Sequence, residues 1–310
     1  MGENAKKKGK KIEVELKRVF ITFFLFFLVT FAREIVHFEG ILLLFCFLKQ
    51  IKTHFRLFPL FAQEMRSKER HEIKVFSNNS ELGSSLSKMV SEISEKSIRE
   101  RGRFMVAISG GSLPSILGPS LLKEKVDFEK WHIFLADERK VEREHPDSNF
   151  FNIKKHILTQ EVKYSEKNFF GIEEKLGLVE CAEDYENRMR KDFQMKEGFP
   201  SFDLILLGMG PDGHTASLFP NHPLLEENNR LISPISDSPK PPPQRITMTL
   251  PLINNALNVL FVCTGAEKKQ VFNKIVQGIP TKEIPSSLIN SKTEKVVWFV
   301  DTNVFEASKI

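Results

Sequence analysis

The residues of this sequence best suited to chemistry are Asp212 and His214, which lie two positions apart in the run Gly208-Met209-Gly210-Pro211-Asp212-Gly213-His214. The apolar residues 204–207 come directly before this run and predict a buried parallel strand. Ligands of open α/β sheets bind where such strands end. Histidine titrates near neutral pH and can take a proton from water. We therefore predict that His214 is a general base and Asp212 its partner; the alternative is a glycine turn with a polar tip.

A second polar segment, Ser109-Gly110-Gly111-Ser112, follows the apolar run 104–108. Two glycines let backbone N–H groups approach an anion, and the helix that Pro114 can open would add its positive end. The segment lacks the lysine of a nucleotide-binding P-loop. It therefore predicts a site for one phosphate group; the alternative is a βα turn without a ligand.

Two further groups of charged residues lie beside predicted strands. Asp137-Glu138-Arg139 follows the run 131–135, and Arg245 opens a strand after the proline-rich loop 238–243. Arg139 could hold a substrate oxygen or a developing oxyanion. Exposed charges at a strand end are usually just solvated, and that is the alternative for the group at 137–139.

Two lysines could also reach the site. Lys268 lies in the first turn of the helix after Thr264-Gly265, where a cation opposes the helix dipole and an anion could hold it. The alternative is a surface lysine, like its neighbour Lys269. Lys240, within the proline-rich loop, either reaches the site or is solvated.

Strands and helices alternate from residue 73 onward. The predicted strands are 73–76, 104–108, 131–135, 204–207, 232–235, 245–250, 258–263 and 296–300. Helices are expected after a Ser80 cap, near 148–158, over 179–193 and from Ala266. This order predicts an α/β fold with a mostly parallel sheet and helices on both faces, in one domain over 71–306.

The charge balance and the cysteines bear on the class of function. Of the 45 Lys and Arg residues, 14 lie in residues 1–72, with 8 of the 40 Asp and Glu, so the rest carries 31 basic and 32 acidic residues. This balance gives no support for nucleic-acid binding by the main domain. Cys46, Cys181 and Cys263 are scattered, without metal spacing or a disulfide framework, which favours a reducing compartment.

Residues 1–70 differ from everything after them. Their apolar runs, 19–32 and 41–48, are shorter than the ~20 residues of a membrane span. A basic start before an apolar core is typical of a secretory signal or anchor, and a translation start at Met65 is a third reading. We expect a cytoplasmic protein, or a secreted or anchored one if residues 1–64 are translated. Membrane contact is expected only through residues 19–48.

Four stretches resemble the 6-phosphogluconolactonase family: residues 108–112, 137–139, 208–220 and 236–245. The resemblance covers about residues 74–301. It implies a Rossmann-like fold related to glucosamine-6-phosphate deaminase and ribose-5-phosphate isomerase, and hydrolysis of 6-phosphoglucono-δ-lactone without a metal or cofactor. It also implies that His214 is the general base and that Arg139 lies beside the sugar. The residues that it assigns to the phosphate are Ser109, Gly110, Gly111, Arg245 and Lys268. We expect a monomer.

Two other functions fit the same residues. An amino-sugar-phosphate deaminase or an aldose–ketose isomerase would use Asp137 as the base that removes a proton from carbon. The proline-rich loop before Arg245 and Pro211 in the central turn favour the lactonase. A sugar-phosphate sensor would keep the pocket without turnover, and the intact pair of Asp212 and His214 argues against it.

Overall fold

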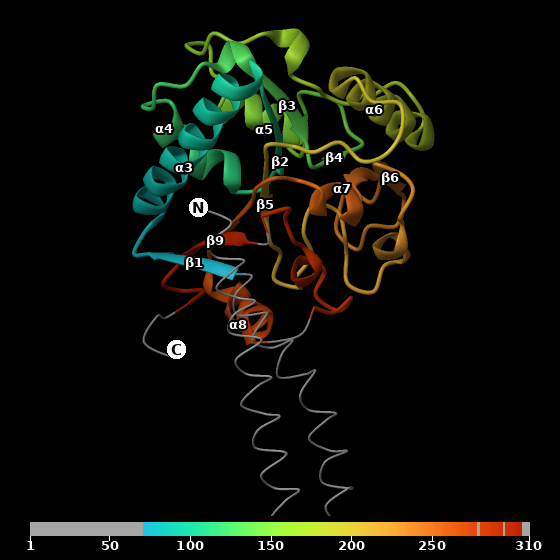
Figure 1. The fold of residues 1–310 in the computed structure, drawn as a ribbon. Helices are drawn as coiled ribbons and strands as arrows, with labels where there is room; N and C mark the ends of the chain where they lie inside the picture. Colours follow the sequence, from blue (N-terminus) through green and yellow to red (C-terminus); the bar gives the residue numbers. More distant parts are fainter. Residues whose placement is uncertain (1–70, 278–279, 294, 306–310) are drawn as a thin grey trace, which may run out of the picture. The chain divides into compact units, whose positions relative to one another are not determined.

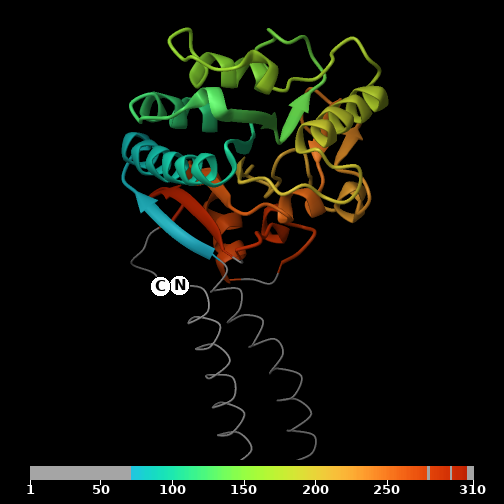
Figure 2. The same ribbon diagram turned by 45° about the horizontal axis from the view of Figure 1, so that its top comes forward.

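The computed structural model describes residues 71–277, 280–293 and 295–305 (Figure 1). Six parallel strands form the main sheet in the order β1-β9-β8-β5-β2-β3. They are β1 (His71–Phe76), β2 (Phe104–Ile108), β3 (Trp131–Leu135), β5 (Leu204–Gly208), β8 (Val259–Cys263) and β9 (Val296–Asp301). The blue β1 and the red β9, from opposite ends of the domain, lie side by side (Figure 2). The predicted parallel sheet is confirmed.

Helices cover both faces of this sheet, as predicted. The α-helices are α3 (Asn79–Arg101), α4 (Leu113–Leu121), α5 (Asn149–His156), α6 (Leu178–Phe193), α7 (Leu250–Asn254) and α8 (Lys269–Gln277). Trp131 and His132 are neighbours on β3, so their side chains point to opposite faces. Trp131 donates to Ser94 of α3, whereas His132 contacts Asp192 of α6. Helices α3 and α6 therefore lie on different faces.

Short 3-10 helices occupy several of the connections: η1 (Phe128–Lys130), η2 (Glu166–Asn168), η3 (Pro223–Glu226), η4 (Ala266–Lys268) and η5 (Pro285–Leu288). The start of α3 corrects one prediction. Its N-cap is Asn78, whose side chain accepts from the Glu81 N–H at 2.9 Å, and not Ser80. Asn78 has the extended backbone that a cap needs, whereas Ser80 lies inside the first turn.

A second sheet has three antiparallel strands, in the order β4-β7-β6. They are β4 (Asp137–Arg139), β7 (Arg245–Met248) and β6 (Ile232–Ile235). The sequence predicted β6 and β7 as strands, but not this separate sheet. Solvation of the charges at 137–139, which the sequence left as an alternative, does not hold for two of them: Asp137 is 4 % and Glu138 1 % exposed. Burial is possible because each carboxylate accepts several hydrogen bonds.

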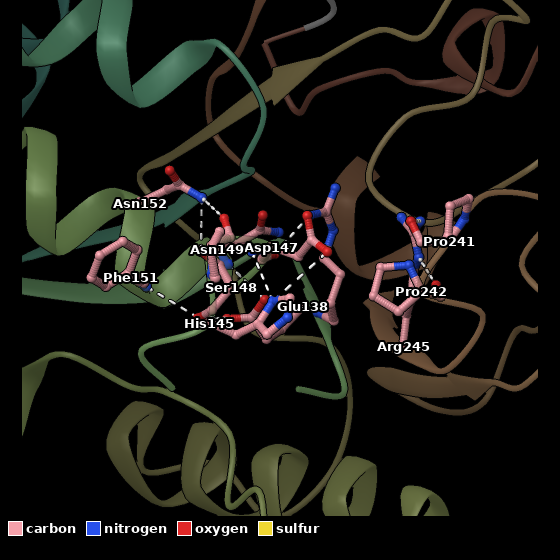
Figure 3. Close-up of polar contacts among 12 residues, drawn as sticks. Glu138, His145, Asp147, Ser148, Asn149, Phe151, Asn152, Pro241, Pro242 and Arg245 are labelled. Atoms are coloured by element: carbon pink, nitrogen blue, oxygen red, sulfur yellow. Dashed lines mark hydrogen bonds and ion pairs between the residues drawn. The ribbon is translucent and has the colours of Figure 1, made fainter. Parts of the chain in front are cut away.

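Glu138 holds the beginning of α5 (Figure 3). Its Oε1 accepts from the N–H groups of Arg139 and Asn149, and its Oε2 accepts from the Phe150 N–H and the Ser148 hydroxyl. A carboxylate is favoured there because it faces the positive end of a helix. Burial raises the pKa of Glu138 to about 7, although the three N–H groups favour the ionised form. The helix start is thereby fixed to β4.

The predictions for residues 1–70, including an extension with membrane contact through residues 19–48, lie outside the described residues. None of the helices in the described ranges combines the length and apolar character that crossing a membrane requires. The boundary of the domain at 71–306, the monomeric state and the cytoplasmic location stay predictions.

Candidate active site

A pocket lies at the carboxyl ends of β2, β5 and β8, next to β4 and β7. All of the predicted site residues except Asp212 line it. These lining residues are Ser109, Gly110, Gly111, Ser112, Arg139, His214, Arg245 and Lys268. Segments distant in the sequence therefore meet at one site, as expected for the carboxyl edge of a parallel sheet.

His214 and Asp212 form a hydrogen-bonded pair. The His214 Nδ1 lies 2.5 Å from the Asp212 Oδ1. An ionised carboxylate only accepts hydrogen bonds, so Nδ1 carries the proton and Nε2 keeps its lone pair. Partial burial raises the pKa of Asp212, but the hydrogen bond and charge of His214 and the charge of Lys240 outweigh it and lower that pKa below its usual range. Asp212 therefore stays ionised and sets the tautomer.

The imidazole of His214 is packed tightly between backbone and an aromatic ring. A Cβ atom added to Gly210 would lie 2.0 Å from the ring Cε1 and 2.1 Å from Nδ1. The imidazole also contacts the ring of the buried Phe219, and the two ring centroids lie 4.9 Å apart. The glycine at 210 is thus required for the close approach of the ring, which fixes its position at the pocket.

The segment 109–112 presents unpaired donors to the pocket. The N–H groups of Gly110 and Gly111 donate to no acceptor among the described residues. Ser112 precedes α4 and makes no side-chain capping bond, and Pro114 lies in the first turn, as predicted. A Cβ atom on Gly110 would lie 1.7 Å from the Asn149 Oδ1. The segment therefore combines free N–H groups with a helix N-terminus, an arrangement that binds anions.

Lys268, in η4, lines the same pocket, and its ammonium group has no hydrogen-bond or ion-pair partner within the described part of the chain. An ammonium group left without a protein partner can bind an anionic ligand without first breaking an internal contact. Its place on the pocket wall favours the anion-binding reading over that of a surface lysine.

Arg139 and Arg245 are directly opposite each other on β4 and β7. Like charges at opposed positions repel. Burial, together with the charge of Arg139, lowers the pKa of Arg245. The Nε of Arg139 is buried and has no partner in the described ranges, while its Nη1 donates to the Asp147 carbonyl at 2.7 Å. Two adjacent cations on the pocket lining suit an anionic group there.

Arg245 also holds the proline-rich loop (Figure 3). Its Nε donates to the Pro242 carbonyl at 3.0 Å, and its Nη2 donates to the carbonyls of Lys240 at 2.9 Å and Pro241 at 3.1 Å. Its Nη1 donates to the Ser217 hydroxyl at 3.3 Å. Of the five N–H groups of the guanidinium, four are thus used, so Arg245 offers the pocket mainly charge.

Asp137 ties the surrounding loops together, a role that the sequence did not suggest. Its Oδ1 accepts from the Ser109 hydroxyl at 2.9 Å and the Asn149 amide at 3.3 Å, and its Oδ2 accepts from the Ser217 hydroxyl at 2.8 Å. Both oxygens are thus occupied, which argues against Asp137 as a base that removes a proton from carbon. Ser217 lies 80 positions away, and no local pattern connects it with Asp137.

Lys240, whose role the sequence left open, reaches the pair. Its Nζ lies 3.2 Å from the Asp212 Oδ1 and 3.2 Å from the His214 Nδ1. It does not line the pocket. The proline-rich loop therefore contacts the predicted base from the side of Nδ1.

A family model described as glucosamine-6-phosphate isomerases/6-phosphogluconolactonase matches residues 77–298. The chain is 40% identical to the human (Homo sapiens) 6-phosphogluconolactonase over 235 residues, which are 74% of this chain and 90% of that protein. It is 40% identical to a probable 6-phosphogluconolactonase 1 of Arabidopsis thaliana over 248 residues, 76% of this chain and 92% of that protein.

Solved structures show the same likeness. The 6-phosphogluconolactonase of Thermotoga maritima is 29% identical with a TM-score of 0.65, covering 75% of this chain and 100% of that one. The enzyme of Trypanosoma cruzi is 28% identical with a TM-score of 0.68, covering 78% and 98%. A monomeric glucosamine-6-phosphate deaminase, 16% identical with a TM-score of 0.61 over 75% and 98%, shares the fold.

Proposed function

Because the chain belongs to the glucosamine-6-phosphate isomerase/6-phosphogluconolactonase family, we propose that it hydrolyses 6-phosphoglucono-1,5-lactone to 6-phosphogluconate in the oxidative pentose phosphate pathway. It is a hydrolase of the carboxylic ester class. The observation that carries this proposal is the pair of Asp212 and His214 on a pocket whose other walls hold unpaired N–H groups and Lys268.

The reaction begins with proton removal from water. A lactone is an activated ester, so a water molecule deprotonated by the His214 Nε2 can attack its carbonyl carbon. A new C–O bond forms, and the electron pair of the C=O bond moves to the carbonyl oxygen. Asp212 holds the Nδ1 proton and stabilises the imidazolium. General-base catalysis of this kind contributes roughly 10²–10⁴-fold.

The tetrahedral oxyanion then needs a hydrogen-bond donor. Arg139, which lines the pocket and whose Nη2 has no acceptor among the described residues, fills this role. When the oxyanion re-forms the carbonyl, the bond from carbon to the ring oxygen breaks. His214 returns its proton to that ring oxygen, which leaves the open-chain acid and restores the neutral imidazole.

The phosphate positions the lactone. In this proposal Ser109, Gly110, Gly111 and Ser112, which line the pocket, bind it. Lys268 supplies a cation, and Arg245, which also lines the pocket, adds charge. Binding the phosphate away from the reacting carbon lets the site fix the lactone before the chemical step.

The test is a lactonase assay with His214→Ala. We expect kcat to fall roughly 10²-fold or more, while calorimetry finds binding of 6-phosphogluconate within a few-fold of the wild type. His132→Ala is the matched control, because His132 also contacts an aspartate but lies on β3 outside the pocket lining. A normal kcat in His214→Ala would remove this residue from the mechanism.

Glucosamine-6-phosphate is the control substrate. Because both oxygens of Asp137 accept hydrogen bonds from neighbouring side chains, we expect no deamination of it. Turnover of this substrate at a rate comparable to lactone hydrolysis would favour the deaminase reading.

A further inference from the structure

Lys240 approaches the catalytic pair from outside the pocket. Its side chain is 37% exposed and is absent from the pocket lining. The ammonium group lies equally close, at 3.2 Å, to the Asp212 Oδ1 and the His214 Nδ1. A residue placed on the Nδ1 side does not meet a substrate that approaches Nε2, so Lys240 acts on the pair and not on the lactone.

Of the two contacts of the Lys240 ammonium, the one with Asp212 is a hydrogen bond and the one with His214 is not. The Nδ1 of His214 already carries a proton directed at Asp212, and an ammonium group only donates. The hydrogen bond of Lys240 therefore goes to the Asp212 carboxylate, which accepts from both residues. No other group in the described ranges donates to this carboxylate.

Asp212 needs this second contact. Its side chain is 34% exposed and lies in a turn between two glycines. A partly exposed side chain held by one hydrogen bond can rotate toward solvent. The Asp212 carboxylate would then lose its hydrogen bond with His214 and accept from water instead. A second bond, with an opposite charge, restricts this rotation.

The proline-rich loop, residues 238–243, holds Lys240 in place. The Arg245 Nη2 donates to the Lys240 and Pro241 carbonyls. The Ser238 hydroxyl donates to the Lys240 carbonyl at 2.9 Å and accepts from the Lys240 N–H at 3.3 Å. The backbone of Lys240 is thus fixed on several sides, so its side chain starts from a defined point.

We propose that Lys240 is a positioning residue, which holds Asp212 against the Nδ1 of His214 and so keeps the Nε2 free to accept a proton. The proposal rests on the proposed role of His214 as the general base. It predicts that Lys240 influences turnover and the imidazole tautomer, and leaves ligand affinity unchanged.

The first test is kinetic. We expect Lys240→Met to lower kcat about tenfold, with KM for the lactone and the Kd of 6-phosphogluconate within twofold of the wild type. Lys282→Met is the matched control, because Lys282 is an exposed lysine that also pairs with a carboxylate, that of Glu226, outside the pocket lining. A rise in KM or Kd larger than the fall in kcat would mean that Lys240 contacts the ligand, and would overturn the proposal.

A double-mutant cycle tests whether Lys240 acts through Asp212. In an Asp212→Asn background the ammonium has no carboxylate to hold, so adding Lys240→Met should lower kcat by less than twofold further. Two effects that multiply in the double variant would contradict the proposal, as would a normal kcat in Asp212→Asn.

The tautomer gives a measurement that does not depend on the lactonase assay. In ¹⁵N-histidine-labelled protein, long-range ¹⁵N–¹H spectra report which ring nitrogen carries the proton, and the signals of His214 are assigned by their loss in His214→Ala. We expect the Nδ1–H form in the wild type and a mixture in Lys240→Met. An unchanged tautomer would overturn the positioning role, whereas a changed tautomer without lactone hydrolysis would count against the proposed function alone.

Discussion

Apart from Arg139 on β4, whose Nε is unpaired, the two sheets supply the pocket with different kinds of polar groups. Loops after the parallel strands β2 and β8 contribute the N–H groups of Gly110 and Gly111 and the ammonium of Lys268, none of which has a partner among the described residues. The antiparallel sheet contributes Asp137 and Arg245, whose polar atoms are nearly all hydrogen-bonded inside the protein. Unpaired groups are available to a ligand, and paired ones fix geometry.

This difference predicts which substitutions should lower stability and which should weaken ligand binding. Removing a paired group from the antiparallel sheet leaves buried donors without an acceptor, so the free energy of unfolding falls. Removing an unpaired group at the parallel sheet leaves the interior intact, so only ligand binding weakens.

The largest effect is expected for Asp137→Ala. The hydroxyls of Ser109 and Ser217 and the amide of Asn149 would lose an acceptor, at about 3 kcal/mol or more of unfolding free energy. Urea denaturation measures this loss. Asp237→Ala is the control, because the side chain of Asp237 is 74% exposed, and should cost below about 1 kcal/mol. Equal unfolding free energies for the two variants would contradict the claim that the paired groups of the antiparallel sheet stabilise the fold.

The intermediate effect is expected for Lys268→Met. Loss of a charged contact to the phosphate should raise KM roughly 10- to 100-fold, or about 1.5–3 kcal/mol of binding. The unfolding free energy should change by less than about 0.5 kcal/mol, because no internal partner is lost. Hydrolysis of unphosphorylated gluconolactone should be unaffected. An unchanged KM for the phosphorylated lactone would return Lys268 to the class of surface lysines.

The parallel sheet is also the part that sequence patterns predict well. Strands β2 and β3 begin and end where their apolar runs do. Such runs report burial on both faces, which depends on the strand alone. The position of His214 at the pocket was predictable for the same reason, because a histidine that follows a buried strand and three glycines can be recognised from the local sequence alone.

The antiparallel sheet was not predicted, because its formation depends on residues that are far apart in the chain. Strand β4 contains three charged residues, and nothing nearby marks Asp137 and Glu138 as buried. Their burial depends on Ser217, Asn149 and β7, which are brought to them only by the fold. The reach of Lys240 to Asp212 likewise depends on Arg245 holding the loop. Side chains that pair across long sequence distances leave no local pattern.

The smallest expected effect is the change of stability with pH, which should have opposite signs for a carboxyl group in each of the two regions. Glu138, beside the antiparallel sheet, has its pKa raised by burial from 4.5 to about 7. Its contribution to stability is therefore fully present below pH 4.5 and is lost as the pH rises through about 7. Asp212, after β5, has its pKa lowered from 3.8 by His214 and Lys240, against the effect of burial. Its contribution is present above pH 3.8 and is lost as the pH falls below it.

Urea titrations at several pH values can separate the two carboxyl groups. The difference in unfolding free energy between the wild type and Glu138→Gln should shrink between pH 5 and 8. The difference between the wild type and Asp212→Asn should shrink between pH 5 and 3, and neither slope can exceed about 1.4 kcal/mol per pH unit for one proton. Because Lys240 helps to lower the pKa of Asp212, Lys240→Met should move the acid-side loss toward higher pH. If the stability contribution of both carboxyl groups changed with pH in the same direction, the two regions would not differ in how they shift the pKa of a carboxyl group.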